Sequence, residues 1–145
     1  MQALEYPFDG EALLRKKRAL RRELAAQPGL VEKKVAIVSG TTVGEVKNML
    51  ELFLLNSGIR PTFWEGPYGL YYESIAFDDG SLAAFAPDVI YIHTSVHNLQ
   101  NLPVPADSAA AAEEKFAAEA ARWQGLWQAA ARFGCPVVQN NFELP

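Results

Sequence analysis

The chain has 145 residues, of which 50% are hydrophobic and 21% charged, and its formal net charge is −4. This length and balance are typical of one soluble globular domain. The single cysteine, Cys135, excludes a disulfide framework and a cysteine-based zinc site, and we expect it to be a small buried hydrophobe. No apolar run reaches the roughly 18 residues of a membrane span, and no signal-peptide pattern is present. We therefore expect a cytoplasmic protein that does not enter membranes.

Charge is distributed unevenly along the chain. Residues 1–34 carry eight Lys or Arg against five Asp or Glu, whereas residues 35–145 carry five against twelve. Binding of nucleic acid requires a broad basic face, and only one short segment is basic. The sequence therefore predicts no nucleic-acid partner.

That basic segment lies in a predicted helix over residues 9–27, with Asp9 at its N-cap. Leu13, Leu20 and Leu24 form its apolar stripe. Six basic residues fall between Arg15 and Arg22, and they suit either a solvated face or a docking surface for an acidic partner. Because helical spacing puts them on one face, the docking candidates are Arg15, Arg18 and Arg22.

A strand, a small-residue turn and a helix follow. Residues 35–38 are a short apolar run typical of a buried strand, and residues 39–42 are the turn. The next helix, which ends at Gly58, is predicted to bury the apolar positions Val43, Val46, Leu50 and Phe53. A second strand over residues 59–65 completes a βαβ unit, which implies a parallel sheet with a right-handed crossover.

The rest of the chain adds two strands and a long helix. Residues 66–86 are aromatic and are predicted to be irregular, and residues 89–93 form the third strand. A loop precedes a helix over residues 107–133, which begins at Asp107 or Ser108, and residues 136–140 form the fourth strand. The predicted buried stripe of this helix is Phe116, Ala120, Trp123, Trp127 and Ala130.

This alternation predicts a three-layer α/β fold with a doubly wound, mostly parallel sheet of strand order 2-1-3-4. Residues 1–30 would be an N-terminal helical extension, and residues 31–145 the α/β domain. In such sheets ligands bind beyond the carboxyl ends of the strands. Nine residues at these ends are therefore candidate ligand-binding residues: Ser39, Gly40, Thr41, Thr42, His93, Thr94, Ser95, Asn98 and Asn140.

Two of these ends suggest chemistry, and each also has a purely structural interpretation. The turn over residues 39–42 offers hydroxyl and N–H groups to an anion, or else Thr41 or Thr42 caps the next helix. His97 could be a general base or simply a hydrogen-bonding residue. No residues stand at a recognisable metal-ligand spacing, so we predict no metal site.

Three separated segments resemble FkbH-like proteins of the haloacid-dehalogenase (HAD) superfamily, subfamily IIIC. They are Leu4-Glu5-Tyr6-Pro7-Phe8-Asp9-Gly10, Pro87-Asp88-Val89-Ile90-Tyr91-Ile92-His93-Thr94 and Gln139-Asn140-Asn141-Phe142-Glu143-Leu144-Pro145. The resemblance covers essentially the whole chain. It implies that this chain is an N-terminal domain resembling the SGNH-hydrolase fold, with a flavodoxin-like strand order.

The resemblance also implies a C-terminal HAD phosphatase domain that uses magnesium and an Asp-x-Asp motif. Some members dephosphorylate a phosphoglycerate unit and load the glyceryl group on an acyl carrier protein for polyketide-type pathways. The present sequence contains no Asp-x-Asp, so the phosphatase domain is absent from it, and we expect this chain to bind no cofactor. The implied partners are that HAD domain and an acyl carrier protein.

The site residues depart from those of SGNH hydrolases. Thr41 stands where the nucleophilic serine would be, and Val96 stands at the oxyanion asparagine. We therefore expect a non-catalytic accessory domain that positions substrate or carrier protein. One alternative is a degenerate hydrolase in which Thr41 and His97 act as weak catalytic candidates. Another is a flavodoxin-like mononucleotide-binding module.

Overall fold

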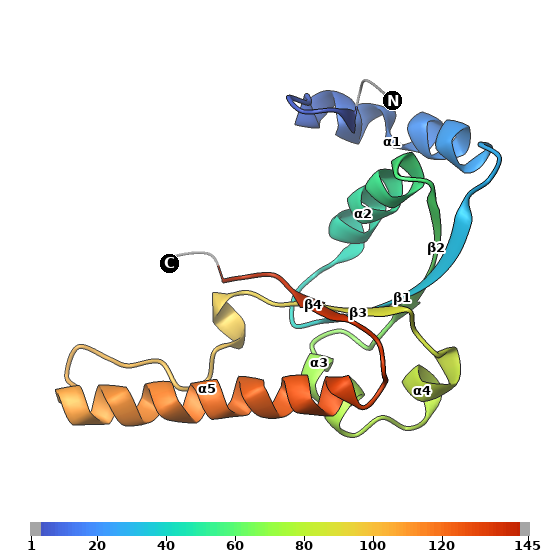
Figure 1. Cartoon of the computed structure of the whole chain (residues 1–145). Coiled ribbons are helices and arrows are strands. Elements are labelled where there is room, and N and C mark those ends of the chain that lie inside the picture. Colours follow the sequence, from blue (N-terminus) through green and yellow to red (C-terminus); the bar gives the residue numbers. More distant parts are fainter. Residues whose placement is uncertain (1–3, 143–145) are drawn as a thin grey trace. The chain divides into compact units, whose positions relative to one another are not determined.

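The structure is a computed structural model that describes residues 4–142 (Figure 1). The last three residues of the third family-like segment, 143–145, lie outside this range. The elements in chain order are α1 (Gly10–Ala25), β1 (Val31–Ser39), α2 (Gly44–Asn56), β2 (Ile59–Glu65), α3 (Tyr71–Ala76), α4 (Ser81–Phe85), β3 (Val89–His93), the 3-10 turn η2 (Val96–Asn98), α5 (Ala109–Ala131) and β4 (Val137–Gln139). No helix in the described range is long and apolar enough to cross a bilayer.

The four strands form one sheet in the order β2-β1-β3-β4. Strands β1 and β3 pair in parallel, with Ile37 opposite Tyr91, and β3 and β4 also pair in parallel, with Tyr91 opposite Val138. Residues 35–39 of β1 are all buried, as expected for a central strand of a parallel sheet. The predicted α/β class and the predicted strand order are both confirmed.

The chain divides into two compact units, each with its own core. The first unit comprises residues 1–34 and 43–63, and the second comprises residues 35–42 and 64–145. The core of the first unit consists almost entirely of leucine: Leu4, Leu13, Leu20, Leu24, Leu52 and Leu55. In the second unit, alternate residues of β1 and β3 (Ala36, Val38, Ile90, Ile92) pack against α3, α4 and α5.

The two helices of the first unit were predicted with unequal success. In α1 the Asp9 carboxylate accepts a hydrogen bond from the Ala12 N–H at 3.1 Å, which confirms the predicted N-cap, and the predicted leucine stripe is buried. In α2 the fully buried residues are Leu52 and Leu55, which the predicted stripe did not include. Its second half is apolar at almost every position, so spacing alone does not reveal the buried face.

Residues 66–86 are not irregular as predicted, because they contain the short helices α3 and α4. Asp78 accepts hydrogen bonds from the N–H groups of Leu82 and Ala83 at 3.0 and 3.1 Å, and Asp79 accepts one from Ser81 at 2.9 Å. The two aspartates thereby satisfy the free N–H groups at the start of α4. Helices of five or six residues are too short to produce a visible apolar period.

Helix α5 begins after Ser108, whose side chain accepts a hydrogen bond from Ala111 N–H, but its predicted buried stripe is partly wrong. Phe116 is 74% exposed and Trp127 is 46% exposed. The buried stripe is instead Glu119, Trp123, Leu126 and Ala130. The first residue of this stripe is a glutamate, and a prediction based on apolar residues alone does not include it.

Cys135 packs against the core of the second unit while keeping partial exposure. Burial raises the pKa of its thiol, and the nearby Asp88 charge adds to the effect. This cysteine is therefore less reactive than a free thiol, in line with a packing role.

Candidate functional site

The turn after β1 approaches the η2 turn closely through Gly40, and both belong to the second unit. The Gly40 N–H donates to the His93 carbonyl at 2.9 Å, and the Gly69 N–H donates to the Ser39 carbonyl at 3.1 Å. A Cβ atom at Gly40 would lie 2.2 Å from the Asn98 Nδ2 atom. Residue 40 is therefore a glycine because a side chain there would collide with Asn98.

The η2 turn is closed by Ser95 and Asn98. The Ser95 N–H donates to Asn98 Oδ1 at 2.9 Å, and the His97 N–H donates to Ser95 Oγ at 3.3 Å. The other end of the Asn98 amide, Nδ2, donates to the Gly40 carbonyl at 3.2 Å. Both polar atoms of the Asn98 side chain are thus engaged in holding two turns together.

The carboxyl end of β4 is fastened to the same region through Thr94, which is 1% exposed. Asn140 forms a reciprocal pair with the Thr94 backbone, accepting from its N–H at 2.9 Å and donating to its carbonyl at 2.7 Å. Gln139 Nε2 donates to Thr94 Oγ1 at 3.2 Å. The ends of β1, β3 and β4 therefore meet, as the predicted grouping of candidate residues requires.

The remaining candidates lie at the periphery of this cluster. The Tyr91 hydroxyl and His93 Nδ1 lie 2.8 Å apart, whereas the His97 side chain is exposed. Thr41 is half-buried and Thr42 is exposed. Neither threonine caps the next helix, because the N-cap of α2 is Val43, which makes no side-chain cap hydrogen bond. In the described part of the chain, no hydrogen bond joins Thr41 to His97.

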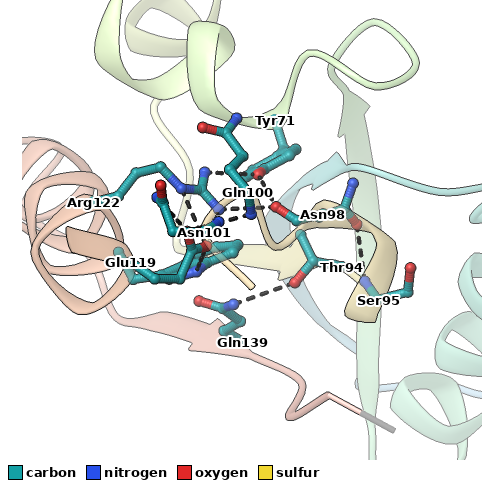
Figure 2. A network of polar contacts seen from close by, with 10 residues as sticks. Tyr71, Thr94, Ser95, Asn98, Gln100, Asn101, Glu119, Arg122 and Gln139 are labelled. Atoms are coloured by element: carbon teal, nitrogen blue, oxygen red, sulfur yellow. Dashed lines mark hydrogen bonds and ion pairs between the residues drawn. The ribbon is translucent and has the colours of Figure 1, made fainter. Parts of the chain in front are cut away.

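A second polar network, which was not predicted from the sequence, lies beside the η2 turn (Figure 2). Its centre is the Glu119 carboxylate of α5, whose side chain is 11% exposed. Oε2 accepts from the Asn101 N–H at 3.1 Å, from Asn101 Nδ2 at 2.9 Å and from the Gln100 N–H at 3.3 Å. Oε1 accepts from Arg122 at 2.6 Å and from Trp123 Nε1 at 2.8 Å.

These contacts fix the ionisation state of Glu119. Burial by itself raises the pKa of a carboxyl group, but hydrogen bonds from Arg122, Asn101 and Trp123 outweigh it and hold the pKa of Glu119 at about 2. The group is therefore a carboxylate throughout the neutral range, and it acts as an acceptor only. It is not suited to proton transfer near pH 7.

Arg122 connects this carboxylate to the candidate site. Its guanidinium donates to the Tyr71 hydroxyl at 3.0 Å and to the Asn98 carbonyl at 2.9 Å, and it lies 4.5 Å from the centre of the Trp123 ring (Figure 2). The ring of Tyr71 in turn stacks on Trp123. Asn98 is therefore held from two sides, by Gly40 through its side chain and by Arg122 through its carbonyl.

A sequence signal for this network does exist. Glu119 lies four residues before Trp123 and in phase with Leu126 and Ala130, so the sequence places a charge on the same helix face as apolar residues. A charged residue on a buried stripe has a partner in most proteins, and Arg122 is available one turn away. The exposed residues Phe116 and Trp127 border this face of the helix, and they shifted the predicted stripe away from Glu119.

Taken together, the site is a rigid polar platform at the carboxyl ends of three strands. In residues 4–142, no three His, Cys, Asp or Glu side chains lie close enough together to hold a metal ion. The side chains of Thr42 and His97 are exposed and that of Thr41 is partly exposed, and their hydroxyl and imidazole groups are suited to hydrogen bonding with a polar ligand or with a neighbouring protein surface.

Comparison with known proteins supports the fold. No protein-family model matches the sequence, and no curated protein matches it. Among solved structures, the chain is similar to the crystal structure of the N-terminal part of the protein BF1531 from Bacteroides fragilis, which contains a phosphatase domain and was crystallised with Mg. The TM-score is 0.67 at 18% sequence identity. The similarity covers 89% of this chain and 34% of that one, so the present chain spans about a third of its length.

Proposed function

We propose that this chain is a non-catalytic accessory domain of a HAD-type phosphatase of the FkbH-like kind. It would position a substrate or a carrier protein for a phosphatase domain that follows it in a longer polypeptide. The observation that carries the proposal is the similarity of 89% of the chain to part of a structure that also contains a phosphatase domain. The three family-like segments point in the same direction.

The geometry of the strand ends supports a binding role over a hydrolytic one. In an acyl-transfer site, amide or N–H donors must be free to stabilise the oxyanion. Here both polar atoms of the Asn98 side chain and of the Asn140 side chain are bound to backbone groups of the turns. These bonds fix the orientation of both amides and stabilise the shape of the platform, which is a structural use of the two side chains.

On this proposal the parent protein removes phosphate from a phosphoglycerate unit and transfers the glyceryl group to an acyl carrier protein. Magnesium would belong to the phosphatase domain. Ser39, Gly40, Thr41, Thr42, His93, Thr94, Ser95, Asn98 and Asn140 are then the platform that meets the substrate or the phosphatase domain, and Arg15, Arg18 and Arg22 are candidates for contact with the carrier protein.

The test compares this chain with a longer protein in which a HAD domain follows it. The chain alone should hydrolyse neither p-nitrophenyl acetate nor p-nitrophenyl phosphate above the rate of a Thr41→Ala/His97→Ala control. The longer protein should release phosphate from 3-phosphoglycerate, and deleting residues 1–145 from it should lower kcat/KM. Esterase turnover that the control abolishes would establish the degenerate hydrolase instead. A yellow purified protein with flavin absorbance would establish the mononucleotide-binding module.

A further inference from the structure

A large groove runs between α1 and α2 within the first unit. Its volume is about 1070 Å³, and it is open to solvent. The side chains that line it are predominantly charged: Lys17, Arg18, Arg21 and Arg22 from α1, and Glu45 and Glu51 from α2. Ala25, Ala26 and Leu52 are among the other lining residues. Four cations therefore face two carboxylates in one groove.

Two of the four cations are neutralised across the groove. Lys17 Nζ lies 2.6 Å from the Glu45 carboxylate, and Arg21 lies 3.5 Å from that of Glu51. Within residues 4–142, Arg18 and Arg22 form no ion pair, and both are exposed. Because they are four residues apart on one helix, their guanidinium groups lie on the same face, one turn from each other. The groove thus has two cations in excess.

We propose that this groove docks an acidic helix of a partner protein, whose carboxylates pair with Arg18 and Arg22. Acidic residues spaced four apart on such a helix repeat at the same interval of one turn as the two arginines. Ala25 and Ala26 also line the groove, and their small side chains leave room for the apolar residues between those acids. The inference deepens the proposed function, because it gives the partner of the accessory domain a place on this chain.

Other anions suit the groove less well. A nucleic acid needs a broad basic face without acidic residues, whereas Glu45 and Glu51 are among the residues that line this one. A single small anion would gain little from two exposed arginines in high-dielectric solvent. A helix with several carboxylates gains from each contact, and its docking is steered by the excess positive charge.

The structure also identifies which basic residues of α1 are placed to bind an acidic helix in the groove. Arg15 was predicted as a docking residue, yet it does not line the groove, and neither does Lys16. Lys17 and Arg21 do line it, but their charges are neutralised by Glu45 and Glu51. Among residues 4–142, only Arg18 and Arg22 combine a place in the groove with a charge that forms no ion pair.

The experiment uses the whole chain and a fluorescein-labelled synthetic helix that carries glutamates at four-residue intervals on an alanine background. Fluorescence anisotropy measures its binding to wild type, to Arg18→Glu/Arg22→Glu and to Arg15→Glu/Lys16→Glu. The last variant is the matched control, because it changes the net charge equally on the same helix. Circular dichroism checks that all three proteins fold alike, and Arg18→Gln/Arg22→Gln replaces the first variant if it does not fold.

We expect Arg18→Glu/Arg22→Glu to weaken binding about tenfold or more at low salt, and the control to weaken it by no more than about threefold. The difference should shrink near 0.5 M NaCl because salt screens exposed charges. Equal weakening by the two variants would overturn the proposal, as would displacement of the peptide by equimolar pyrophosphate. Either result leaves the accessory role intact, whereas failure of the phosphatase-deletion test leaves the groove intact.

Discussion

The two units of the chain use charge in opposite ways. The first unit contains ten basic against seven acidic residues, and the second contains three against ten. In the first unit the ion pairs lie on the surface; in the Lys17–Glu45 pair the side chains are 30% and 62% exposed. In the second unit the Glu119–Arg122 pair is 11% and 14% exposed and has additional hydrogen-bond donors around it.

The difference in exposure gives the ion pairs of the two units different roles: those of the first unit are suited to binding a partner, and the pair of the second unit supports the fold. Exposed pairs contribute little to stability, and the cations beside them stay available to a partner. A buried pair holds its neighbours firmly, because removing one member leaves the other charged and desolvated. The first unit therefore presents charge outward, while the second unit uses charge to fix the turn that carries Asn98.

The largest expected effect comes from Glu119→Gln. Loss of the carboxylate leaves Arg122 buried without a counter-charge, and the amide that replaces it turns one donor toward the N–H groups of Asn101 and Gln100. We expect the free energy of unfolding to fall by about 3 kcal/mol, measured by urea denaturation. Glu114→Gln, at an exposed position of the same helix, is the control and should change little. A loss below about 1 kcal/mol for Glu119→Gln would remove the contrast between the units.

The dependence of the free energy of unfolding on pH tests the same carboxylate, because low pH protonates Glu119 without replacing the side chain. The pKa of Glu119 is about 2 in the folded chain against an ordinary value of 4.5. A lowered carboxyl pKa stabilises the folded state above the unfolded value, and this contribution disappears as pH falls from about 4.5 toward 2.

Between pH 5 and pH 2, wild type should therefore lose about 2–3 kcal/mol more than Glu119→Gln does. The other carboxyl groups titrate in both proteins and cancel in the difference. Parallel pH profiles of the two proteins would show that Glu119 is not the responsible group.

Gly40→Ala should have an intermediate effect, because its Cβ would lie 2.2 Å from the Asn98 amide. Arg122 holds the Asn98 carbonyl, so the turn cannot easily move away. We expect a loss of about 2 kcal/mol in thermal or urea unfolding, as for other overpacked sites. Asn98→Ala in the same chain should recover part of it. Gly125→Ala, where an added Cβ meets nothing within 4 Å, should be neutral or slightly stabilising.

The smallest effect is expected in the first unit, from Glu45→Gln. The Lys17 hydrogen bond lowers the pKa of Glu45, but the group is exposed to solvent and screened by salt. The unfolding midpoint should shift far less than for Glu119→Gln, and the shift should vanish at high salt. A double-mutant cycle with Lys17→Met measures the pair directly. A coupling as large as that of the Glu119 network would contradict the proposed division between the units.

Local patterns were sufficient for the strands and for the loops that follow them. Apolar runs such as residues 35–38 and 89–93 can be recognised as strands from the sequence alone. Residues 35–38 are buried throughout, as in a central parallel strand, whereas in the second run only Ile90 and Ile92 are fully buried. Because parallel strands end at one edge, the residues after them were predicted to meet, and Gly40, Thr94, Asn98 and Asn140 do. The N-cap Asp9 was likewise predicted, and Ser108 was one of the two residues predicted to begin the long helix, because capping involves only neighbouring residues.

Only the tertiary structure decided which face of each helix is buried and which polar groups are partners. In α2, apolar residues lie on most sides of the helix. Leu52 and Leu55 are the buried ones because they pack in one core with the leucines of α1. In α5, Glu119 is buried while Phe116 is exposed, because donors from residues 100, 101, 122 and 123 converge on the carboxylate. Those donors come from segments up to 19 residues away in sequence, and only the folded chain brings them together.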